Sequence, residues 1–406
     1  MGMKSLKELY RIGTGPSSSH TMAPRQAARI FVGKNRDAAK INVTLFGSLA
    51  ATGKGHLTDV AIIDTIKPVT EVEIIWKPTV FLPFHPNGMR FEALTPEGQI
   101  KDKWEVYSVG GGALAEEGMG RSETKDVYEM STLTEILRWC ERTGKTYWEY
   151  VEECEGPEIW DYLGQVWNTM AAAVERGLDQ EGVLPGPLGL RRRANTYNVR
   201  ASGYKSNLQS RGLVFSYALA VSEENASGGE IVTAPTCGSC GVVPGVLYHL
   251  KKSREFSDAR VYRALATAGL IGNVVKHNAS IAGAEVGCQG EVGVACAMAA
   301  AAANQLFGGS PAQIEYAAEM GLEHHLGMTC DPVCGMVQIP CIERNAYAAA
   351  RALDANLYSM FTDGEHRVSF DHVVEVMKQT GHDLPSIYKE TGEGGLASVW
   401  SLDSQP

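Results

Sequence analysis

Two short segments in the first third of the chain alternate apolar and polar residues. Residues 40–46 (KINVTLF) and 71–76 (EVEIIW) place an apolar side chain at every second position, with only Phe46 and Ile75 out of pattern. Alternation of this kind is typical of a strand with one buried face. Glycine-containing segments at 47–49 and 110–112 indicate tight turns or close-packed loops in the same region. Strands mixed with helical patterns predict a small α/β domain.

From about residue 131 the hydrophobic pattern becomes helical, and no further strand is predicted. Residues 133–139 and 162–170 repeat apolar side chains at intervals of three and four. Later segments are rich in alanine and apolar on nearly every side, which is typical of helices in the middle of a bundle. These segments are residues 260–275, 293–307 and 345–353.

These patterns predict an α+β chain with two domains. We expect an α/β domain at residues 1–128, followed by an all-helical catalytic domain at residues 129–406. A chain of 406 residues exceeds the size at which one hydrophobic core usually suffices, so two domains are the default. The tail from residue 390 is predicted to be poorly structured as far as the Gly394–Gly395 pair.

Composition and charge narrow the class of protein. Hydrophobic residues make up 44% of the chain and charged residues 21%, which is ordinary for a globular protein. The net charge of −10 argues against a nucleic-acid-binding surface, which needs clustered positive charge. The N-terminus lacks the apolar core of a signal peptide, and the most apolar run, residues 292–303, is too short to span a membrane. We therefore expect a cytoplasmic protein without nucleic-acid or membrane partners.

The cysteines are the strongest chemical signal. Nine cysteines without an export signal indicate a reducing compartment, where clustered thiols suggest metal binding or catalysis before disulfides. Cys237 and Cys240 form an isolated C-x-x-C pair, a weak signal that buried thiols explain best. Cys288, Cys330 and Cys341 each lie within two residues of glycine or proline and near a polar side chain. Pattern alone favours metal ligation only modestly over buried thiols for these three, and thiolates suit zinc and iron–sulfur clusters alike.

Longer motifs run through nearly the whole chain. In the first half they are GTGPSSSHTMAPRQAA at 13–28, FGSLAATGKGHLTD at 46–59, FHPNGM at 84–89 and YSVGGG at 107–112. In the second half they are SGGEIVTAPT at 227–236, NASIAGAEVGCQGEVGVACAMAAA at 278–301 and GLEHHLGMTCDPVCGMVQIPCIERNA at 321–346. In content and order they resemble the bacterial iron–sulfur-dependent L-serine dehydratases (L-serine ammonia-lyases), in the single-chain form without an ACT domain.

The resemblance implies a 4Fe–4S cluster on the family's three ligand cysteines, which are Cys288, Cys330 and Cys341 in this sequence. Three thiolates leave one iron without a cysteine, an arrangement suited to catalysis rather than electron transfer. The implied reaction is dehydration of L-serine to pyruvate and ammonia, with the open iron acting as a Lewis acid on the hydroxyl. A homodimer is also expected. Cys237 interrupts the family's APTNG pattern and Cys334 replaces a small residue, which leaves open which nearby thiols bind iron.

A polar segment supplies candidate substrate-binding and acid–base residues. Ser18, Ser19, His20 and Thr21 precede a helical pattern at residues 25–31. Hydroxyls and N–H groups at a helix start favour an anion such as a carboxylate, and simple N-capping is an equally good explanation. By the resemblance, His20 would bind the substrate carboxylate and Thr21 would be a candidate base. A threonine hydroxyl is a weak base unless it is strongly activated.

Histidine is chemically better suited to proton transfer near neutral pH, so His85 is the second acid–base candidate. A lone histidine is more often structural, and His56 is interpreted in that way. Lys276 and Asn278, just before the first ligand cysteine, are candidate pocket residues whose default role is helix-end polarity. Arg344, close to the third ligand cysteine, would pair with a carboxylate or offset the negative charge of the cluster.

Two other classes of protein compete with this interpretation. A structural zinc protein without lyase activity would hold a closed four-thiolate site made by Cys237, Cys240, Cys330 and Cys334. A pyridoxal-phosphate dehydratase would need a Schiff-base lysine and a glycine-rich phosphate cup, a context that Lys276 lacks.

Overall fold

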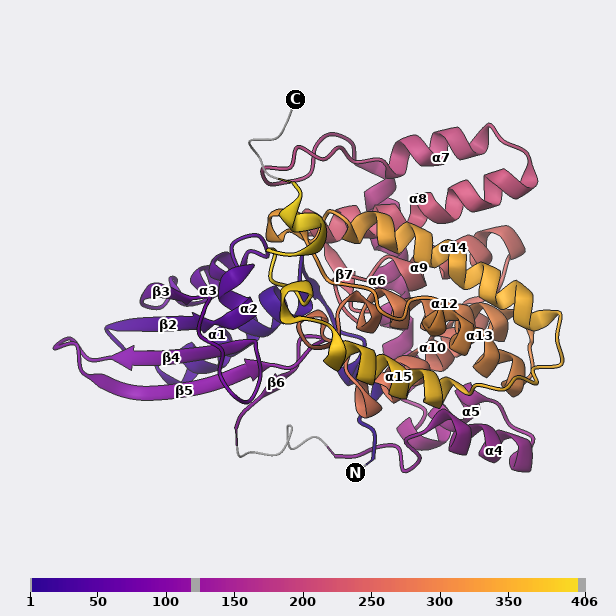
Figure 1. The fold of residues 1–406 in the computed structure, drawn as a ribbon, viewed down its shortest axis with the longest axis horizontal. Helices are drawn as coiled ribbons and strands as arrows, with labels where there is room; N and C mark the ends of the chain where they lie inside the picture. The colour runs from indigo at the N-terminus through magenta and orange to yellow at the C-terminus, as the bar shows by residue number, and fades with distance from the viewer. Residues whose placement is uncertain (1, 118–124, 401–406) are drawn as a thin grey trace.

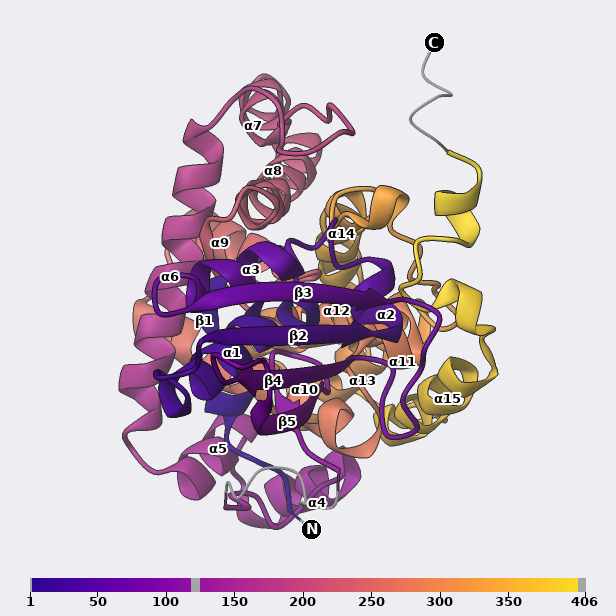
Figure 2. The ribbon, with the colours of Figure 1, turned by 90° about the vertical axis from the view of Figure 1, so that its left-hand side faces the viewer.

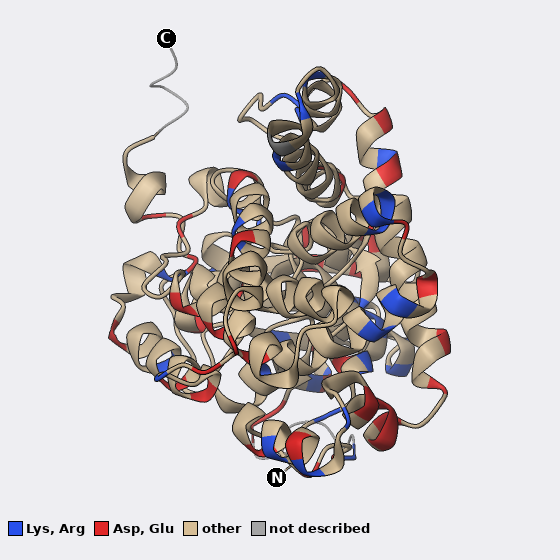
Figure 3. Cartoon of the chain, turned by 90° about the vertical axis from the view of Figure 1, so that its right-hand side faces the viewer, with Lys and Arg blue, Asp and Glu red and all other residues tan. Residues whose placement is uncertain are grey.

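The computed structural model describes residues 2–117 and 125–400 and has the predicted α+β architecture (Figure 1). A small sheet with short helices forms one side of the molecule, and a large body of helices forms the other. None of the helices within the described ranges has the length and hydropathy needed to cross a bilayer. Basic and acidic residues are interspersed along the helices on this side of the molecule (Figure 3).

The sheet has five strands in the order β3–β2–β4–β5–β6. Their bounds are β2 (Lys40–Phe46), β3 (Glu71–Lys77), β4 (Gly88–Leu94), β5 (Ile100–Ser108) and β6 (Leu114–Ala115). β2 pairs in parallel with β3, and the other neighbours pair antiparallel. A parallel pair needs a crossover, which α2 (Gly47–Ala51) and α3 (Thr58–Ile66) provide. The predicted strands at 40–46 and 71–76 are confirmed as β2 and β3.

One face of this sheet is buried by helices α1 (Ala23–Lys34) and α3. Phe31 of α1 packs against Phe91 of β4 and Trp104 of β5, with ring centroids 5.4 Å and 6.4 Å apart. Figure 2 looks onto the sheet, with the helical body behind it. The segment between Thr14 and α1 is therefore held between the sheet and the helical body.

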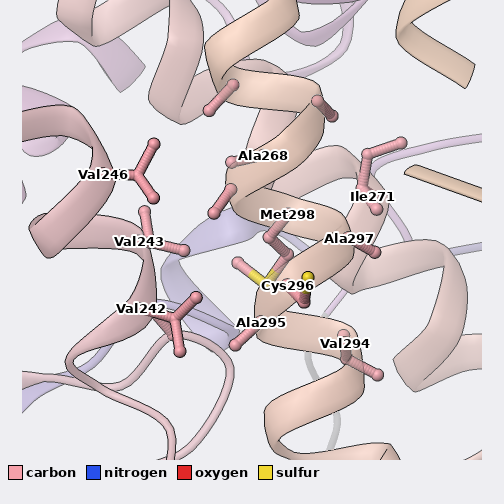
Figure 4. Packing of buried hydrophobic residues seen from close by; sticks show 14 of the residues in the cluster. Val242, Val243, Val246, Ala268, Ile271, Val294, Ala295, Cys296, Ala297 and Met298 are labelled. Carbon is pink, nitrogen blue, oxygen red and sulfur yellow. The ribbon is translucent and has the colours of Figure 1, made fainter. Parts of the chain in front are cut away.

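The helical body is built around α12 (Val292–Phe307), in which nearly every side chain is buried. Small side chains allow α9, α10, α13 and α14 to pack closely around it, as Figure 4 shows for the contacts with α9 and α10. The other bounds are α4 (Leu133–Thr143), α5 (Tyr147–Glu155), α6 (Ile159–Asp179), α7 (Ala194–Ser202), α8 (Ser206–Ala226), α9 (Val242–Arg254), α10 (Asp258–Asn278), α11 (Gly283–Val286), α13 (Pro311–Glu323), α14 (Cys341–Met360) and α15 (Phe370–Asp383).

The predicted central position is confirmed for residues 260–275 and 293–307, most of which are buried in α10 and α12. It is wrong for residues 345–353, because one face of α14 lies at the surface and Tyr347 is 70% exposed. The alanines of this segment face inward and the longer side chains face outward. Composition alone therefore concealed an amphipathic helix.

The first residues of the chain pack in the helical body rather than beside the sheet. Leu6, Leu9 and Tyr10 are fully buried in its core. Strand β1 (Ile12–Thr14) pairs antiparallel with β7 (Glu230–Val232), a three-residue strand that is too short to give a periodic signal and was not predicted. The N-terminal segment thus fastens the two parts together, and the domain boundary at 128/129 stays a prediction.

Candidate active site between the sheet and the helical body

The three predicted ligand cysteines come together from separate segments of the helical body. Cys288 begins the short helix η3 (Cys288–Gly290), Cys330 lies in the loop after α13, and Cys341 is the first residue of α14. The first two are buried and the third is half-buried. Their thiols interact electrostatically with one another and with Glu291. The N-terminal end of α14 favours a thiolate at Cys341 because the helix dipole is positive there.

Burial and one guanidinium set the charge at this site. Burial raises the pKa of Cys288 to about 11 and raises the pKa values of Cys330 and Cys341 well above the ordinary value. Arg344 opposes this shift at Cys288 through its charge and a hydrogen bond. The same guanidinium donates to Thr329 O at 2.7 Å and to Asp331 Oδ1 at 3.0 Å. Thiols held in this way become thiolates readily only when they bind a metal.

The spacing of these thiols fits a group larger than one ion. Tetrahedral zinc, with Zn–S bonds of about 2.3 Å, holds its sulfur atoms roughly 3.8 Å apart. Among the described residues, the only trio of donor atoms within 4.8 Å of one another is that of His20, His56 and Glu390. The three cysteine sulfurs are therefore more widely separated than one zinc ion requires. A multi-iron cluster needs a wider set of ligands.

The four cysteines that a structural zinc site would require do not come together in space. Cys237 Sγ lies 3.3 Å from Met22 Sδ, and Cys240 Sγ faces Val221 O at 4.0 Å, so both behave as buried thiols. Cys334 is exposed, with a left-handed backbone at φ 55°. A closed four-thiolate site is not supported.

The backbone of Gly283 lies so close to the cysteine site that a side chain would not fit there. A Cβ atom at Gly283 would lie 2.8 Å from Glu291 Oε2 and 3.2 Å from Cys330 Sγ. Glu291 is itself buried, and its Oε1 accepts a hydrogen bond from Thr236 Oγ1 at 2.7 Å. Glu291 was recognised from the sequence only as a nearby polar residue.

The Ser17–Thr21 segment reaches this site from the sheet side, as a π-helical turn that leads into α1. His20 is fully buried, and burial lowers its pKa to about 4, so its ring is neutral at physiological pH. Its Nδ1 lies 2.9 Å from Ser19 Oγ and its Nε2 lies 3.2 Å from Ser48 Oγ. Thr21 Oγ1 donates to His56 O at 2.7 Å and accepts from Ser17 N, so its hydroxyl already has both partners. Ser18 is buried in the same turn.

Glu390 connects the two sides of the site. Its Oε1 lies 3.4 Å from His20 Nδ1 and 4.0 Å from His56 Nε2. Its backbone N–H donates to Cys330 O at 2.9 Å, and Ser48 Oγ donates to its carbonyl oxygen at 2.9 Å. A residue beside one ligand cysteine therefore also touches the histidines of the N-terminal part.

The sequence did not identify Glu390 as a site residue and did not predict that His56 lies at the site. Glu390 falls in the tail that was predicted to be poorly structured, which is wrong here because the residue is only 6% exposed. Leu396 N–H donates to Asp331 Oδ2 at 2.9 Å, which fixes the segment further along. His56 is buried against His20, with ring centroids 4.5 Å apart, rather than standing alone. Residues 401–406 of the tail lie outside the described residues.

The remaining candidates, His85, Lys276 and Asn278, make contacts in different parts of the molecule. His85 Nδ1 accepts from Asn87 N–H at 3.1 Å, its Nε2 faces Glu285 Oε1 at 3.3 Å, and its charge affects His20. Lys276 Nζ donates to Glu8 O and Asn278 Nδ2 donates to Ser131 O, both at 2.7 Å. These two contacts tie α10 to neighbouring backbone, and a role in substrate binding stays a prediction for both residues.

The comparisons with known proteins agree with this architecture. The family model described as serine dehydratase alpha chain matches residues 99–397, and the one described as serine dehydratase beta chain matches residues 5–69 and 64–119. The chain belongs to the serine dehydratase family, with both parts joined in one polypeptide.

Individual relatives extend over nearly the full length of the chain. An L-serine dehydratase of Streptomyces coelicolor is 42% identical, over 97% of this chain and 98% of its own length. L-serine dehydratase 1 of Escherichia coli is 41% identical, over 97% and 99%, and an L-serine dehydratase of Helicobacter pylori is 34% identical, over 98% and 99%.

Proposed function

We propose that this chain is an L-serine dehydratase that converts L-serine to pyruvate and ammonia with the help of a 4Fe–4S cluster. The observation that carries the proposal is the convergence of three cysteines with His20 of the Ser17–Thr21 segment and with His56, through Glu390. The relatives named L-serine dehydratase, which match almost end to end, support the substrate. We also expect a cytoplasmic homodimer, which sizing by light scattering would test.

Cys288, Cys330 and Cys341 would hold the cluster, because their thiols interact electrostatically with one another but do not all lie within 4.8 Å of one another, as the ligands of a single zinc ion would. When bound through three thiolates, such a cluster supplies a Lewis-acidic iron that stabilises the departing hydroxyl. Arg344 lies beside Cys288 and offsets the negative charge of the thiolates. The buried walls exclude water and strengthen every electrostatic contact inside.

The chain's own residues would bind the substrate and move its protons. Ser18, Ser19 and the N–H groups at the start of the turn suit the substrate carboxylate. Thr21 has both hydrogen-bond partners occupied, so we assign it a positioning role. We assign proton transfer to His85, a buried histidine whose Nδ1 accepts from Asn87 N–H and whose Nε2 lies 3.3 Å from Glu285 Oε1, because an imidazole exchanges a proton near neutral pH more readily than a hydroxyl does.

Replacement of the ligand cysteines tests the cluster assignment. Cys288→Ser, Cys330→Ser or Cys341→Ser should abolish both the brown colour and pyruvate formation, because each removes one of three thiolates. The measurement is iron and sulfide content after anaerobic purification, followed by a pyruvate assay with L-serine. Cys237→Ser is the matched control, since its thiol packs against Met22, and it should keep colour and activity.

The opposite pattern, with colour lost in Cys237→Ser and kept in Cys330→Ser, would overturn the ligand assignment. A colourless protein containing stoichiometric zinc would favour the structural zinc alternative instead. Loss of activity after borohydride treatment would point to pyridoxal phosphate.

A further inference from the structure

Glu390 is a buried carboxylate without a permanent cation beside it. It is 6% exposed, and its ion-pair partners among the described residues are His20 and His56, both of which burial keeps neutral. The guanidinium of Arg344 is engaged by Asp331 and Cys288. Burial raises the pKa of Glu390 because no cation offsets its loss of hydration, so the retention of an acid at this position needs a reason.

The hydrogen bonds of His20 and His56 show which of their ring nitrogens carry no proton; these are called bare nitrogens below. Ser48 gives its hydroxyl proton to Glu390 O, so it must accept from His20 Nε2–H, and the neutral ring leaves Nδ1 without a proton. Thr52 gives its hydroxyl proton to Ser48 O, so it must accept from His56 Nδ1–H, which leaves His56 Nε2 bare. Both bare nitrogens face Glu390.

Three hydrogen-bond acceptors therefore converge on one point. They are His20 Nδ1, His56 Nε2 and a carboxylate oxygen of Glu390, all within 4.8 Å of one another and all buried. Ser19 Oγ donates to His20 Nδ1, and the backbone N–H of Ala284 donates to the Glu390 carboxyl group. A group that carries positive charge and several N–H donors would complete this arrangement.

The position of Glu390 is fixed by the surrounding backbone. Its φ of 57° is in the left-handed region, which is unfavourable for a residue with a side chain. Hydrogen bonds from Cys330 N–H to Tyr388 O at 2.8 Å and from Glu390 N–H to Cys330 O at 2.9 Å hold it there. The carboxyl group of Glu390 is therefore held at a fixed position relative to Cys330, a predicted cluster ligand.

We propose that Glu390, together with the bare nitrogens of His20 and His56, binds the α-ammonium group of the substrate and so selects amino acids over acids that lack an amine. An α-ammonium group has three N–H donors and a full positive charge, which matches three acceptors, one of them an acid that a neighbouring cation favours in its charged form. The inference rests on the proposed function and replaces the carboxylate-binding role that the resemblance implied for His20. Glu291 is a poorer candidate, because it is not part of the cluster of acceptors, which consists of His20, His56 and Glu390.

The test compares two inert ligands that differ in the amine. L-Alanine has the α-ammonium and carboxylate groups but no hydroxyl to eliminate, and propionate lacks the amine as well. Affinities are measured by calorimetry on anaerobically prepared holoprotein. In Glu390→Gln the affinity for L-alanine should fall by about 10- to 100-fold, as expected for loss of a charge-assisted hydrogen bond, and that for propionate should stay unchanged. Glu393→Gln, an exposed residue of the same segment, should change neither.

Glu390→Asp, which keeps the charge on a shorter side chain, should lose less affinity for L-alanine than Glu390→Gln. Equal losses for both ligands, or no loss for either, would overturn the proposal. So would a stoichiometric divalent ion, found by metal analysis in the wild type and absent from Glu390→Gln, because the three acceptors would then be a metal site. Pyruvate formation from L-serine by the wild type reports separately on the proposed function.

Discussion

At the scale of single residues, the site concentrates acidic groups in a place that water does not reach. Glu291, Glu390 and three thiols interact with one another, and Arg344 is the cation that faces the thiols. Burial raises the pKa values of both carboxyl groups, and Glu291 raises that of Glu390 further. Such an arrangement destabilises the fold unless ligands complete it, which is the pattern expected of a functional site.

Gly283 offers a residue-scale test of how tightly the cysteine site is packed. In Gly283→Ala the new methyl group would lie 2.8 Å from Glu291 Oε2 and 3.2 Å from Cys330 Sγ, so one of them must move. We expect most of the bound iron to be lost while the helical circular dichroism is retained, with iron per chain as the measurement. Gly33→Ala is the control, because no atom lies within 4 Å of its added methyl group. Full iron content in Gly283→Ala would contradict this account of the site.

At the scale of elements, a histidine joins helix α13 to the start of α15. His366 Nδ1 faces Gly364 O at 2.9 Å and its Nε2 faces Glu315 Oε2 at 2.8 Å, so both ring nitrogens point at acceptors. The ring stacks on Tyr316 at 4.2 Å. Glu315 also accepts from the N–H of Phe370, the first residue of α15. This geometry requires the charged imidazolium, and the Glu315 carboxylate raises the pKa of His366 to about 9.

The sign of the pH effect follows from this shift. Because the folded-state pKa lies above the ordinary 6.5, the stabilisation is complete below pH 6.5 and is lost as the pH rises through about 9. After allowance for solvent screening, it is worth about 1 to 2 kcal/mol. His366→Gln should therefore lower the free energy of unfolding at pH 6 and have little effect near pH 10, as measured by urea denaturation. A difference between the two proteins that is independent of pH would refute this assignment.

Element prediction succeeded where burial follows a simple period. The alternating segment 40–46 is β2, and the alanine-rich segment 293–307 lies in the almost fully buried α12, because each pattern reflects the faces that the fold covers. Prediction of the site succeeded for cysteines, whose chemistry is visible in the residue type. It failed for His56 and Glu390, because they meet through contacts between distant segments that no local pattern encodes.

At the scale of the whole molecule, the N-terminal segment shares a core with the helical body, whereas the sheet has a separate core of its own. The N-terminal segment that precedes the sheet lies in the helical body, where Tyr10 Oη donates to Leu265 O at 2.9 Å. The chain that leads into the site from the sheet side is therefore anchored in the core of the helical body. The Ser17–Thr21 segment follows this anchor within a few residues, so the geometry of the site depends on it.

Leu6 tests this shared core. Its side chain is fully buried and packs into the notch left by Gly269 of α10, where an added Cβ would lie 2.8 Å from Leu6 Cδ1. Leu6→Ala leaves a cavity in the helical body, so the free energy of unfolding should fall by about 2–5 kcal/mol. Since the helical body holds most of the helices, the loss should appear in urea denaturation followed by helical circular dichroism. Leu357→Ala, at a 54% exposed position on α14, should change stability by less than about 0.5 kcal/mol. If Leu6→Ala lowered the free energy of unfolding no more than Leu357→Ala does, the packing of the N-terminal segment in the helical body would not contribute to stability. That packing would then not be what aligns the two sides of the site.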